Sequence, residues 1–314
     1  MHAGQGKPRR LHFALGRITC SPDASPCVPE EGSDLNRLAE KPLVSIITPS
    51  YNTGAFIEQT LCSVALQDYP RIEHIVLDSG STDGSREILA RHPSVHLVAS
   101  APQGLSAKVN QGFAMARGDI VGWLNADDFY LPGAISSAVD AFRRNPDAAM
   151  VYCNFLLVDE RGAEIERERT RQADWREMLA RNFVPLEGAF IRREVLEQVG
   201  PVSSRFPLVQ DWDLWLRISK RFPVVHVDEW WGAFRVRPGQ RCDVYKFDYW
   251  LQARTMTQEH GGRLLPLFRH YWGQRLRRAG GMLHRREFGR IRTKLHEYIR
   301  SVGRREETGH RTDY

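Results

Sequence analysis

Two adjacent carboxylates follow an apolar segment in the stretch Val121–Gly133, which reads VGWLNADDFYLPG. Asp127 and Asp128 repel each other, and burial of either carboxylate is costly without a positive partner. Hard divalent cations such as Mg²⁺ or Mn²⁺ prefer oxygen ligands, and they commonly join one or two carboxylates to substrate phosphates. The pair therefore indicates a bound cation or a bound substrate, with a solvated loop as the simpler alternative.

Two further polar segments also follow continuous apolar runs, which are typical of strands buried on both faces. LVSIITPSYN ends in Pro49–Asn52, and HIVLDSGSTDGS ends in Asp78–Asp83. Helical patterns separate these runs, and their alternation predicts an α/β fold with a doubly wound, mostly parallel sheet flanked by helices. Ligands bind outside the carboxyl ends of the strands in such sheets, so the three polar segments are expected to converge on one cleft.

Composition divides the 314-residue chain into three parts. Residues 1–40 contain many Pro and Gly and few periodic hydrophobic positions, which predicts a flexible leader. Residues 41–240 carry the α/β pattern, and residues 241–314 are predicted to form a basic helical C-terminal extension. The formal net charge of +6 consists of +9 in residues 261–314 and −3 in the rest of the chain, which favours an anionic surface as the partner of the tail.

The sequence also excludes several classes of protein and site. No apolar run approaches the length of a membrane span, and the N-terminus lacks the apolar core of a signal peptide, so a cytoplasmic protein is expected. There is no Walker A motif, no GxGxxG after a strand and no HExxH motif. The five cysteines are scattered without metal-ligand spacing. No segment resembles a nucleic-acid recognition module, so nucleic acid is not an expected partner.

Four segments together resemble the motifs of family 2 glycosyltransferases with the GT-A fold. They read VSIITPSYN, VLDSGSTDGS, QGLSAKVNQGFAMARGDIVGWLNADD and QDWDLWLR, and the match covers about residues 43–240. The resemblance implies a nucleotide-sugar half over residues 41–130 and an acceptor half over residues 131–240. It implies an inverting, metal-dependent transfer of a sugar from a nucleotide-sugar donor, expected to be UDP-linked, to a glycan or lipid-linked acceptor hydroxyl. Surface polysaccharide synthesis is the implied setting, and Mg²⁺ or Mn²⁺ is the implied cofactor.

The first two motifs imply which residues hold the donor nucleotide. Pro49 and Tyr51, at the end of the first strand, and Asp78, at the end of the second, are implied to surround the base and ribose. Lys108 occupies a position where the family often has a basic residue near the nucleotide.

NADD matches the DXD motif of the family, with Asn125 in place of the frequent first Asp. Asp127 is then implied to meet both the metal and the diphosphate, and Asp128 beside it is the second expected metal ligand. The segment FRVRPGQ carries Arg237 where the family often has a His. Arginine cannot ligate a metal, but it can bind phosphate oxygens, so Arg237 either replaces part of the cation's role or is a surface residue.

QDWD matches the ED motif of the family, with Gln210 in place of Glu, and it implies that Asp211 is the catalytic base. The positive end of the helix dipole would keep this carboxylate ionised at neutral pH, as a base requires. The alternative for Asp211 is an N-cap role. Trp212 and Trp215 flank the proposed base and belong either to an acceptor site or to the core.

Two other functions stay open. A sugar-phosphate nucleotidyltransferase of the same fold would need a Gly-rich, basic loop after the first strand, and PSYNTGAF lacks one. A non-catalytic module that binds a nucleotide sugar or a glycan would keep Asp78 without needing Asp211.

The tail contains a predicted basic amphipathic helix between Arg285 and Val302. It could pack on its own domain, dimerise, or lie on an anionic membrane surface. In the last case the protein would be peripheral on the inner face of the membrane.

Overall fold

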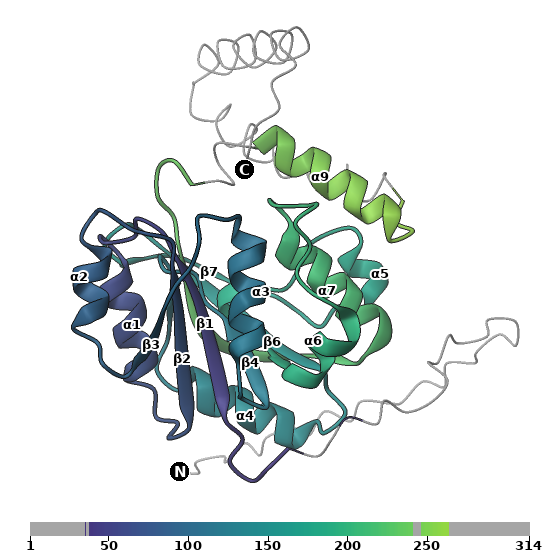
Figure 1. Cartoon of the computed structure of the whole chain (residues 1–314). Coiled ribbons are helices and arrows are strands. Elements are labelled where there is room, and N and C mark those ends of the chain that lie inside the picture. The colour runs from purple at the N-terminus through teal and green to yellow at the C-terminus, as the bar shows by residue number, and fades with distance from the viewer. Residues whose placement is uncertain (1–34, 36–37, 241–245, 264–314) are drawn as a thin grey trace, which may run out of the picture. The chain divides into compact units, whose positions relative to one another are not determined.

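A computed structural model describes residues 35, 38–240 and 246–263, which belong to one compact unit (Figure 1). The predicted leader lies almost entirely outside these residues, and the predicted basic helix of the tail lies wholly outside them. The first half of the unit alternates strands and helices, as the sequence predicts. Its elements are β1 (Val44–Ser50), α1 (Ile57–Ala65), β2 (Ile72–Asp78), α2 (Ser85–Ala90), β3 (Val95–Ala99), α3 (Leu105–Met115) and β4 (Ile120–Trp123).

The second half is less regular and contains shorter elements. They are β5 (Phe129–Tyr130), α4 (Ala134–Arg144), β6 (Met150–Val158), β7 (Glu164–Glu168), α5 (Trp175–Met178), the 3-10 helix η1 (Leu186–Gly188), β8 (Ala189–Arg192), α6 (Arg193–Val199), α7 (Gln210–Arg221), β9 (Val224–Arg235) and α9 (Lys246–Glu259). Gly200 ends α6 with a φ of 82°, a left-handed conformation that glycine adopts at low cost.

The strands form one sheet in the order β3-β2-β1-β4-β8-β6-β9-β5, and β7 pairs with β6. The predicted parallel arrangement holds for β1 to β4. The second half is mixed, because β8 runs antiparallel to both β4 and β6 while β9 runs parallel to β6. Since β8 runs opposite to β4, the residues just before β8 lie at the carboxyl end of β4.

The sheet is covered by helices on both faces, which confirms the predicted α/β fold. All seven residues of β1 are buried. Neighbouring side chains on a strand point to opposite faces. Accordingly, Ile46 packs in a cluster with residues of α1 and α4, whereas Ile47 packs in a cluster with residues of α3, α6 and α7.

Helix α9 packs on this unit, although the sequence places it in the C-terminal extension. Ala253 and Met256 are buried in the same cluster as the apolar residues of α7. Polar contacts support the packing, because His260 Nε2 lies 2.9 Å from Asp213 Oδ1 and Arg205 forms an ion pair with Glu259. Helix α9 therefore packs on elements that precede residue 240.

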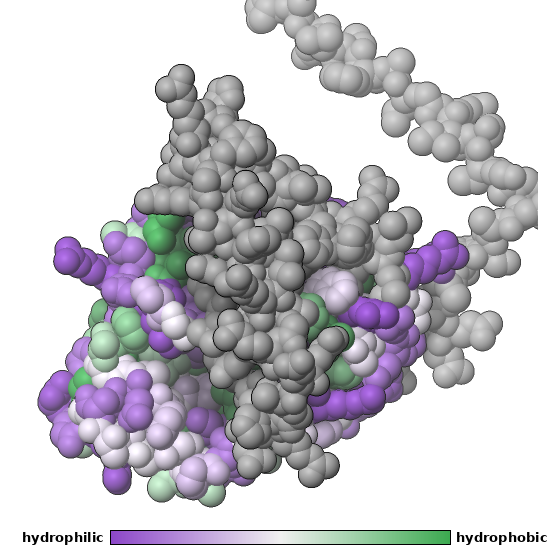
Figure 2. Space-filling model, turned by 90° about the horizontal axis from the view of Figure 1, so that it is seen from above, coloured by the Kyte–Doolittle hydropathy of each residue, from purple (hydrophilic) through white to green (hydrophobic). Residues whose placement is uncertain are grey.

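The described surface is mainly hydrophilic in the view of Figure 2, and its apolar patches are small. No helix within the described ranges is long and apolar enough to span a bilayer.

Helix α3 crosses the sheet closely at Gly112. A Cβ atom at this position would collide with Ile47 Cγ2 of β1 and would lie 3.0 Å from Leu77 Cδ1 of β2. The helix therefore needs glycine here to approach the strands that carry the site.

We expect Gly112→Ala to lower the free energy of unfolding by about 1–2 kcal/mol, because the overpacking cost exceeds the gain in helix propensity. Urea unfolding measures this change. Ala114→Leu adds bulk on the exposed side of the same helix and should shift stability by no more than about 0.5 kcal/mol. A Gly112→Ala variant more stable than the wild type would contradict the close packing.

Candidate functional site

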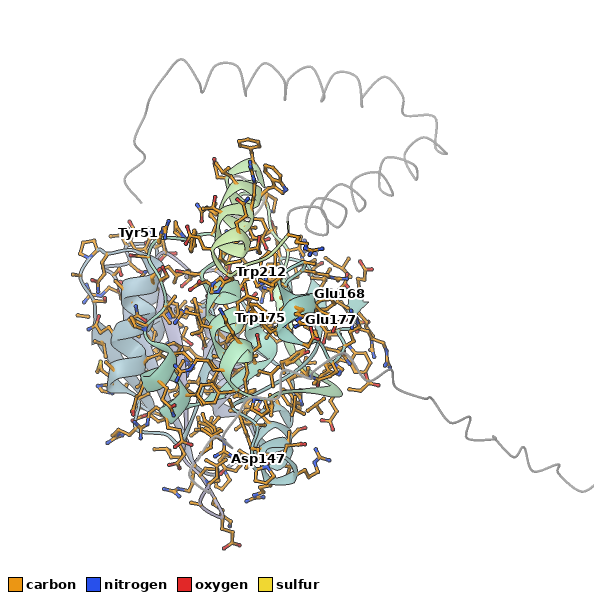
Figure 3. The ribbon with its side chains drawn as sticks, turned by 90° about the vertical axis from the view of Figure 1, so that its right-hand side faces the viewer. Tyr51, Asp147, Glu168, Trp175, Glu177 and Trp212 are labelled. Carbon is orange, nitrogen blue, oxygen red and sulfur yellow. The ribbon has the colours of Figure 1, made fainter. Side chains whose placement is uncertain are left out.

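A cavity of about 990 Å³ opens at the carboxyl ends of the parallel strands. Tyr51 lies at this end of the molecule and Asp147 at the opposite end (Figure 3). The residues proposed from the sequence that line the cavity are Pro49, Tyr51, Lys108, Asn125, Asp127, Asp128, Asp211 and Arg237. Two of the three polar strand ends therefore converge as expected, together with residues from the second half of the chain.

Lys108 and Tyr51 form one side of the cavity. Lys108 is only 7% exposed, and its Nζ lies 3.5 Å from the carbonyl oxygen of Ser50 and 5.9 Å from the centre of the Tyr51 ring. Tyr51 is itself 58% exposed. An exposed aromatic ring beside a lysine offers a stacking surface and a positive charge to a ligand.

Asp78 is not among the described residues that line the cavity. Its Oδ2 accepts hydrogen bonds from the backbone N–H groups of Gly80 and Ser81, and its Oδ1 accepts one from the Ser81 hydroxyl. Ser81 Oγ in turn accepts the backbone N–H of Asn52, at the end of β1. Asp78 thus orders the turn after β2 and joins it to the turn after β1.

The acidic loop Asn125–Asp128 follows β4, and Asp128 is its buried member at 2% exposure. Asp128 Oδ1 accepts the backbone N–H of Arg235 at 2.9 Å, and Oδ2 lies 3.4 Å from Asn125 Nδ2. Burial, and then the nearby carboxylates of Asp127 and Glu187, raise the pKa of Asp128 well above its ordinary value. Asp128 therefore resembles an internal support of the loop more than an open ligand.

Asp127 faces the cavity and is paired with Arg237. Its Oδ2 accepts hydrogen bonds from Nε and Nη2 of Arg237 at 3.0 and 2.9 Å. The arginine at this position is therefore not a free surface residue. The two side chains place a carboxylate and a guanidinium side by side at the entrance to the loop, where a diphosphate and its cation could bind.

Arg235 holds the acidic loop in place, although the sequence did not single it out. Its side chain is 1% exposed, and its Nε donates to the carbonyl oxygen of Asp127 at 2.7 Å. The other nitrogens donate to the carbonyl oxygens of Asp159 and Glu160 and to Gln59 Oε1. The loop, the β6–β7 connection and α1 are therefore joined by one guanidinium.

The donor set around Asp127 fits a divalent cation in part. Asp127 offers an oxygen that no described protein group bonds, whereas both oxygens of Asp128 face N–H donors. In the part of the chain that the structure describes, three possible ligand atoms lie within 4.8 Å of one another only at Glu58, Cys62 and His92, which do not line the cavity. A cation at Asp127 would therefore take most of its ligands from phosphate oxygens and water, as Mg²⁺ commonly does.

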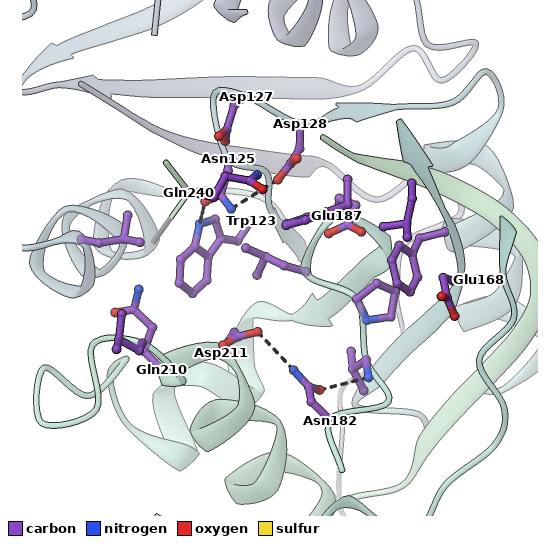
Figure 4. Close-up of a pocket in the computed structure, with 18 of the residues that line it drawn as sticks. Trp123, Asn125, Asp127, Asp128, Glu168, Asn182, Glu187, Gln210, Asp211 and Gln240 are labelled. Atoms are coloured by element: carbon purple, nitrogen blue, oxygen red, sulfur yellow. Dashed lines mark hydrogen bonds between the residues drawn. The ribbon is translucent and has the colours of Figure 1, made fainter. Parts of the chain in front are cut away.

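Asp211 lies across the cavity from the acidic loop, in the first turn of α7 (Figure 4). The N-cap position is held by Val209, so Asp211 does not have the N-cap role considered as an alternative. Its Oδ2 lies 3.3 Å from Asn182 Nδ2. Burial raises the pKa of Asp211, while backbone N–H groups and Asn182 oppose the rise. The effect of burial on the pKa of Asp211 thus outweighs the expected effect of the helix dipole, and the raised pKa makes this carboxylate a stronger base than an ordinary Asp.

The two tryptophans beside Asp211 belong to the core. Trp212 is 3% exposed and donates its indole N–H to the carbonyl oxygen of Met178, and Trp215 is 1% exposed. Neither is among the described residues that line the cavity. Gln210, in contrast, lines the cavity and contacts Ser106 Oγ of α3 through its Oε1. The start of α7 is therefore fixed against α3.

The family model for "Glycosyl transferase family 2" matches residues 45–200 of this chain. The chain belongs to family 2 of the glycosyltransferases. It is 33% identical over 195 residues to the O-antigen biosynthesis protein RfbC of Myxococcus xanthus, a match that covers 59% of this chain and 15% of RfbC. The matched region covers between 15% and 59% of the length of eight of the most similar curated relatives.

Solved structures share the GT-A fold with this family 2 chain. S. aureus TarS 1–349 in complex with UDP has a TM-score of 0.56 and 17% identity, covering 69% of this chain and 65% of TarS. The mannosyltransferase PcManGT of Pyrobaculum calidifontis, in complex with GDP-Man and Mn²⁺, has a TM-score of 0.54 and 18% identity, covering 88% of this chain and 90% of that one. At these identities the likeness shows the fold alone.

Glu187 also lines the cavity, and it is not among the site residues expected from the sequence. It belongs to η1, which directly precedes the antiparallel strand β8 and therefore lies at the carboxyl end of β4. Glu187 is 2% exposed, and burial raises its pKa from 4.5 to about 7. The segment PLEGAF contains no periodic pattern that would have identified this residue.

The raised pKa of Glu187 predicts that the free energy of unfolding falls as the pH rises. The protonated form is favoured in the fold, so the contribution of Glu187 to stability is fully present below pH 4.5 and is lost as the pH rises through about 7. The interval between these pKa values corresponds to about 3 kcal/mol. The urea midpoint of Glu187→Gln should therefore exceed that of the wild type, and the difference between the two midpoints should grow as the pH is raised from 5 to 8. An offset between the two proteins that does not change with pH would contradict this assignment.

Proposed function

We propose that this chain is an inverting, metal-dependent glycosyltransferase that moves a sugar from a nucleotide-sugar donor to an acceptor hydroxyl. The observation that carries the proposal is the cavity in which Asp127, which is paired with Arg237, lies opposite Asp211. A phosphate-binding group and a candidate base thus face one open cavity, and its volume of about 990 Å³ can hold a nucleotide sugar.

The donor nucleotide is proposed to lie along the ends of β1 and β4. Its base would stack near Tyr51 and Pro49, with the turn ordered by Asp78 on one side. Lys108 and Arg237 would bind phosphate oxygens. A UDP-linked donor is proposed. TarS, which shares the fold, was solved with UDP and with UDP-GlcNAc, and PcManGT, which also shares it, was solved with GDP-Man.

A divalent cation at Asp127, when bound, would neutralise the charge that develops on the diphosphate leaving group. The residues of the chain supply the remaining functions. Arg237 donates hydrogen bonds to anionic oxygens, and Asp128 and Arg235 hold the loop in position. Asp211 accepts the proton of the attacking hydroxyl. One displacement at the anomeric carbon inverts its configuration.

The acceptor is proposed to be a glycan or a lipid-linked sugar of a surface polysaccharide. Residues of the second half, among them Phe155, Phe183 and Phe234, line the part of the cavity available to it. Apolar ring faces of this kind pack well against sugars. The similarity to RfbC, an O-antigen biosynthesis protein, supports the same setting.

Changing Asp211 to Asn tests the base. We expect kcat for transfer to fall by about 10²–10⁴-fold, because an amide cannot accept the proton. The affinity for the donor, measured by calorimetry, should stay within about twofold, since Asp211 does not hold the nucleotide. Asp140→Asn, on an exposed ion pair with Arg143, is the matched control and should keep full activity. Transfer by Asp211→Asn within a few-fold of the wild type would rule out Asp211 as the base.

A second test concerns the cation and Arg237. Chelator should abolish turnover of UDP-glucose, UDP-galactose or GDP-mannose, and Mn²⁺ should restore it. Asp127→Asn should raise the Mn²⁺ concentration needed for half-maximal activity by about tenfold or more, because a ligand charge is lost.

Arg237→Gln should instead weaken UDP affinity by about tenfold, through the loss of charge-assisted hydrogen bonds, without raising that Mn²⁺ requirement. Arg91→Gln removes a guanidinium from an exposed ion pair with Glu58 and is the matched control. Full activity in the presence of chelator would remove the metal from the mechanism.

A further inference from the structure

Glu187 presents a buried carboxylate whose Oε1 has no hydrogen-bond partner among the described residues. It lies between the acidic loop on one side and Asp211 with Asn182 on the other (Figure 4). Resting on the proposed function, we propose that Glu187 binds hydroxyl groups of the donor's sugar ring, and that it selects a ring without a negative charge. Glu187 would then be a specificity-determining residue for the reaction.

The two arginines next to the acidic loop, Arg235 and Arg237, do not pair with this carboxylate. The donors of Arg235 are directed at backbone carbonyl oxygens and at Gln59, and Arg237 is directed at Asp127. Leaving a buried acceptor oxygen without a donor costs free energy. The cost is understandable if a ligand that enters the cavity supplies the donor.

The backbone at Glu187 packs closely against β9, which fixes the point from which the side chain extends. A Cβ atom on Gly232 of β9 would collide with the carbonyl oxygen of Glu187. The 3-10 helix is followed at once by β8, which pairs with β4 and β6. A side chain on such a rigid support is well suited to position a ligand.

The chemistry around Glu187 specifies the kind of group it would bind. A carboxylate accepts hydrogen bonds, and sugar hydroxyl groups donate them. Asp127, Asp128 and Asp211 lie near enough to influence the charge of Glu187 or to be influenced by it. This concentration of acidic side chains disfavours a second anion, so a neutral hexose fits the space and a uronic acid does not.

The geometry also places the donor's sugar, rather than the acceptor, at Glu187. The ring that is transferred must extend from the diphosphate, bound near Asp127, to the carbon that the hydroxyl held by Asp211 attacks. Glu187 lines the space between these two residues.

The test compares wild type, Glu187→Gln and Glu187→Ala in titration calorimetry with Mn²⁺. The ligands are UDP, UDP-glucose and UDP-glucuronate, with GDP and GDP-mannose as a second pair. We expect both variants to bind UDP or GDP as the wild type does, within about twofold, and to bind the corresponding neutral nucleotide sugar about tenfold or more weakly. Donor hydrolysis should fall in parallel.

A comparison of a neutral nucleotide sugar with a negatively charged one separates a change in donor specificity from a general loss of binding. The wild type should bind UDP-glucose more tightly than UDP-glucuronate. Glu187→Gln should reduce the ratio of these two affinities by about fivefold or more, because it replaces an acidic side chain by a neutral one of the same size. Glu197→Gln, on an exposed ion pair with Arg193, is the matched control. Thermal unfolding checks that each variant is folded, and the Gln variant carries the test if the Ala variant is not.

Three outcomes overturn the inference. Equal losses of UDP and UDP-sugar affinity would indicate a structural role. Donor affinity and hydrolysis unchanged in both variants would exclude contact with the donor's sugar, and a loss confined to transfer would assign Glu187 to the acceptor. If the wild type itself neither binds nor hydrolyses any nucleotide sugar, the proposed function fails, independently of Glu187.

Discussion

The burial of one guanidinium, that of Arg235, is the interaction on which the arrangement of the site depends. A buried cation is tolerated only when its donors are paired, and here they are paired with three different parts of the chain. The backbone N–H of the same residue holds Asp128. The acidic loop after β4 is therefore fixed by contacts to β9, to the β6–β7 connection and to α1, and not by its local sequence alone.

This arrangement explains how the site tolerates several carboxylates around one cavity. Asp128 accepts hydrogen bonds from N–H donors, and Asp127 accepts them from Arg237. Asp211 accepts one from Asn182. A cation that binds at Asp127 meets a carboxylate that already has a positive partner, so metal binding and the position of Arg237 are linked. Glu187 differs from these carboxylates because its Oε1, which the described protein groups leave unbonded, is also buried.

Much of the fold and part of the site could be predicted because they follow from the first half of the sequence. Buried parallel strands have continuous apolar runs, and their carboxyl ends share one edge, so the convergence of Tyr51 and Asp127 follows from the pattern. Glu187 and Arg235 could not be found in this way. Their positions depend on β8 running antiparallel and on β9 ending beside the acidic loop, and neither strand direction is encoded by local periodicity.

The docking of α9 has a practical consequence for how this chain may be divided. Asp213, two positions after Asp211, bonds His260 through one oxygen and Arg217 through the other. A fragment that ended at residue 240 would lose the first of these bonds and would expose the apolar surface that Ala253 and Met256 cover. A fragment that keeps these contacts therefore extends past the GT-A motifs and includes residues up to at least 260.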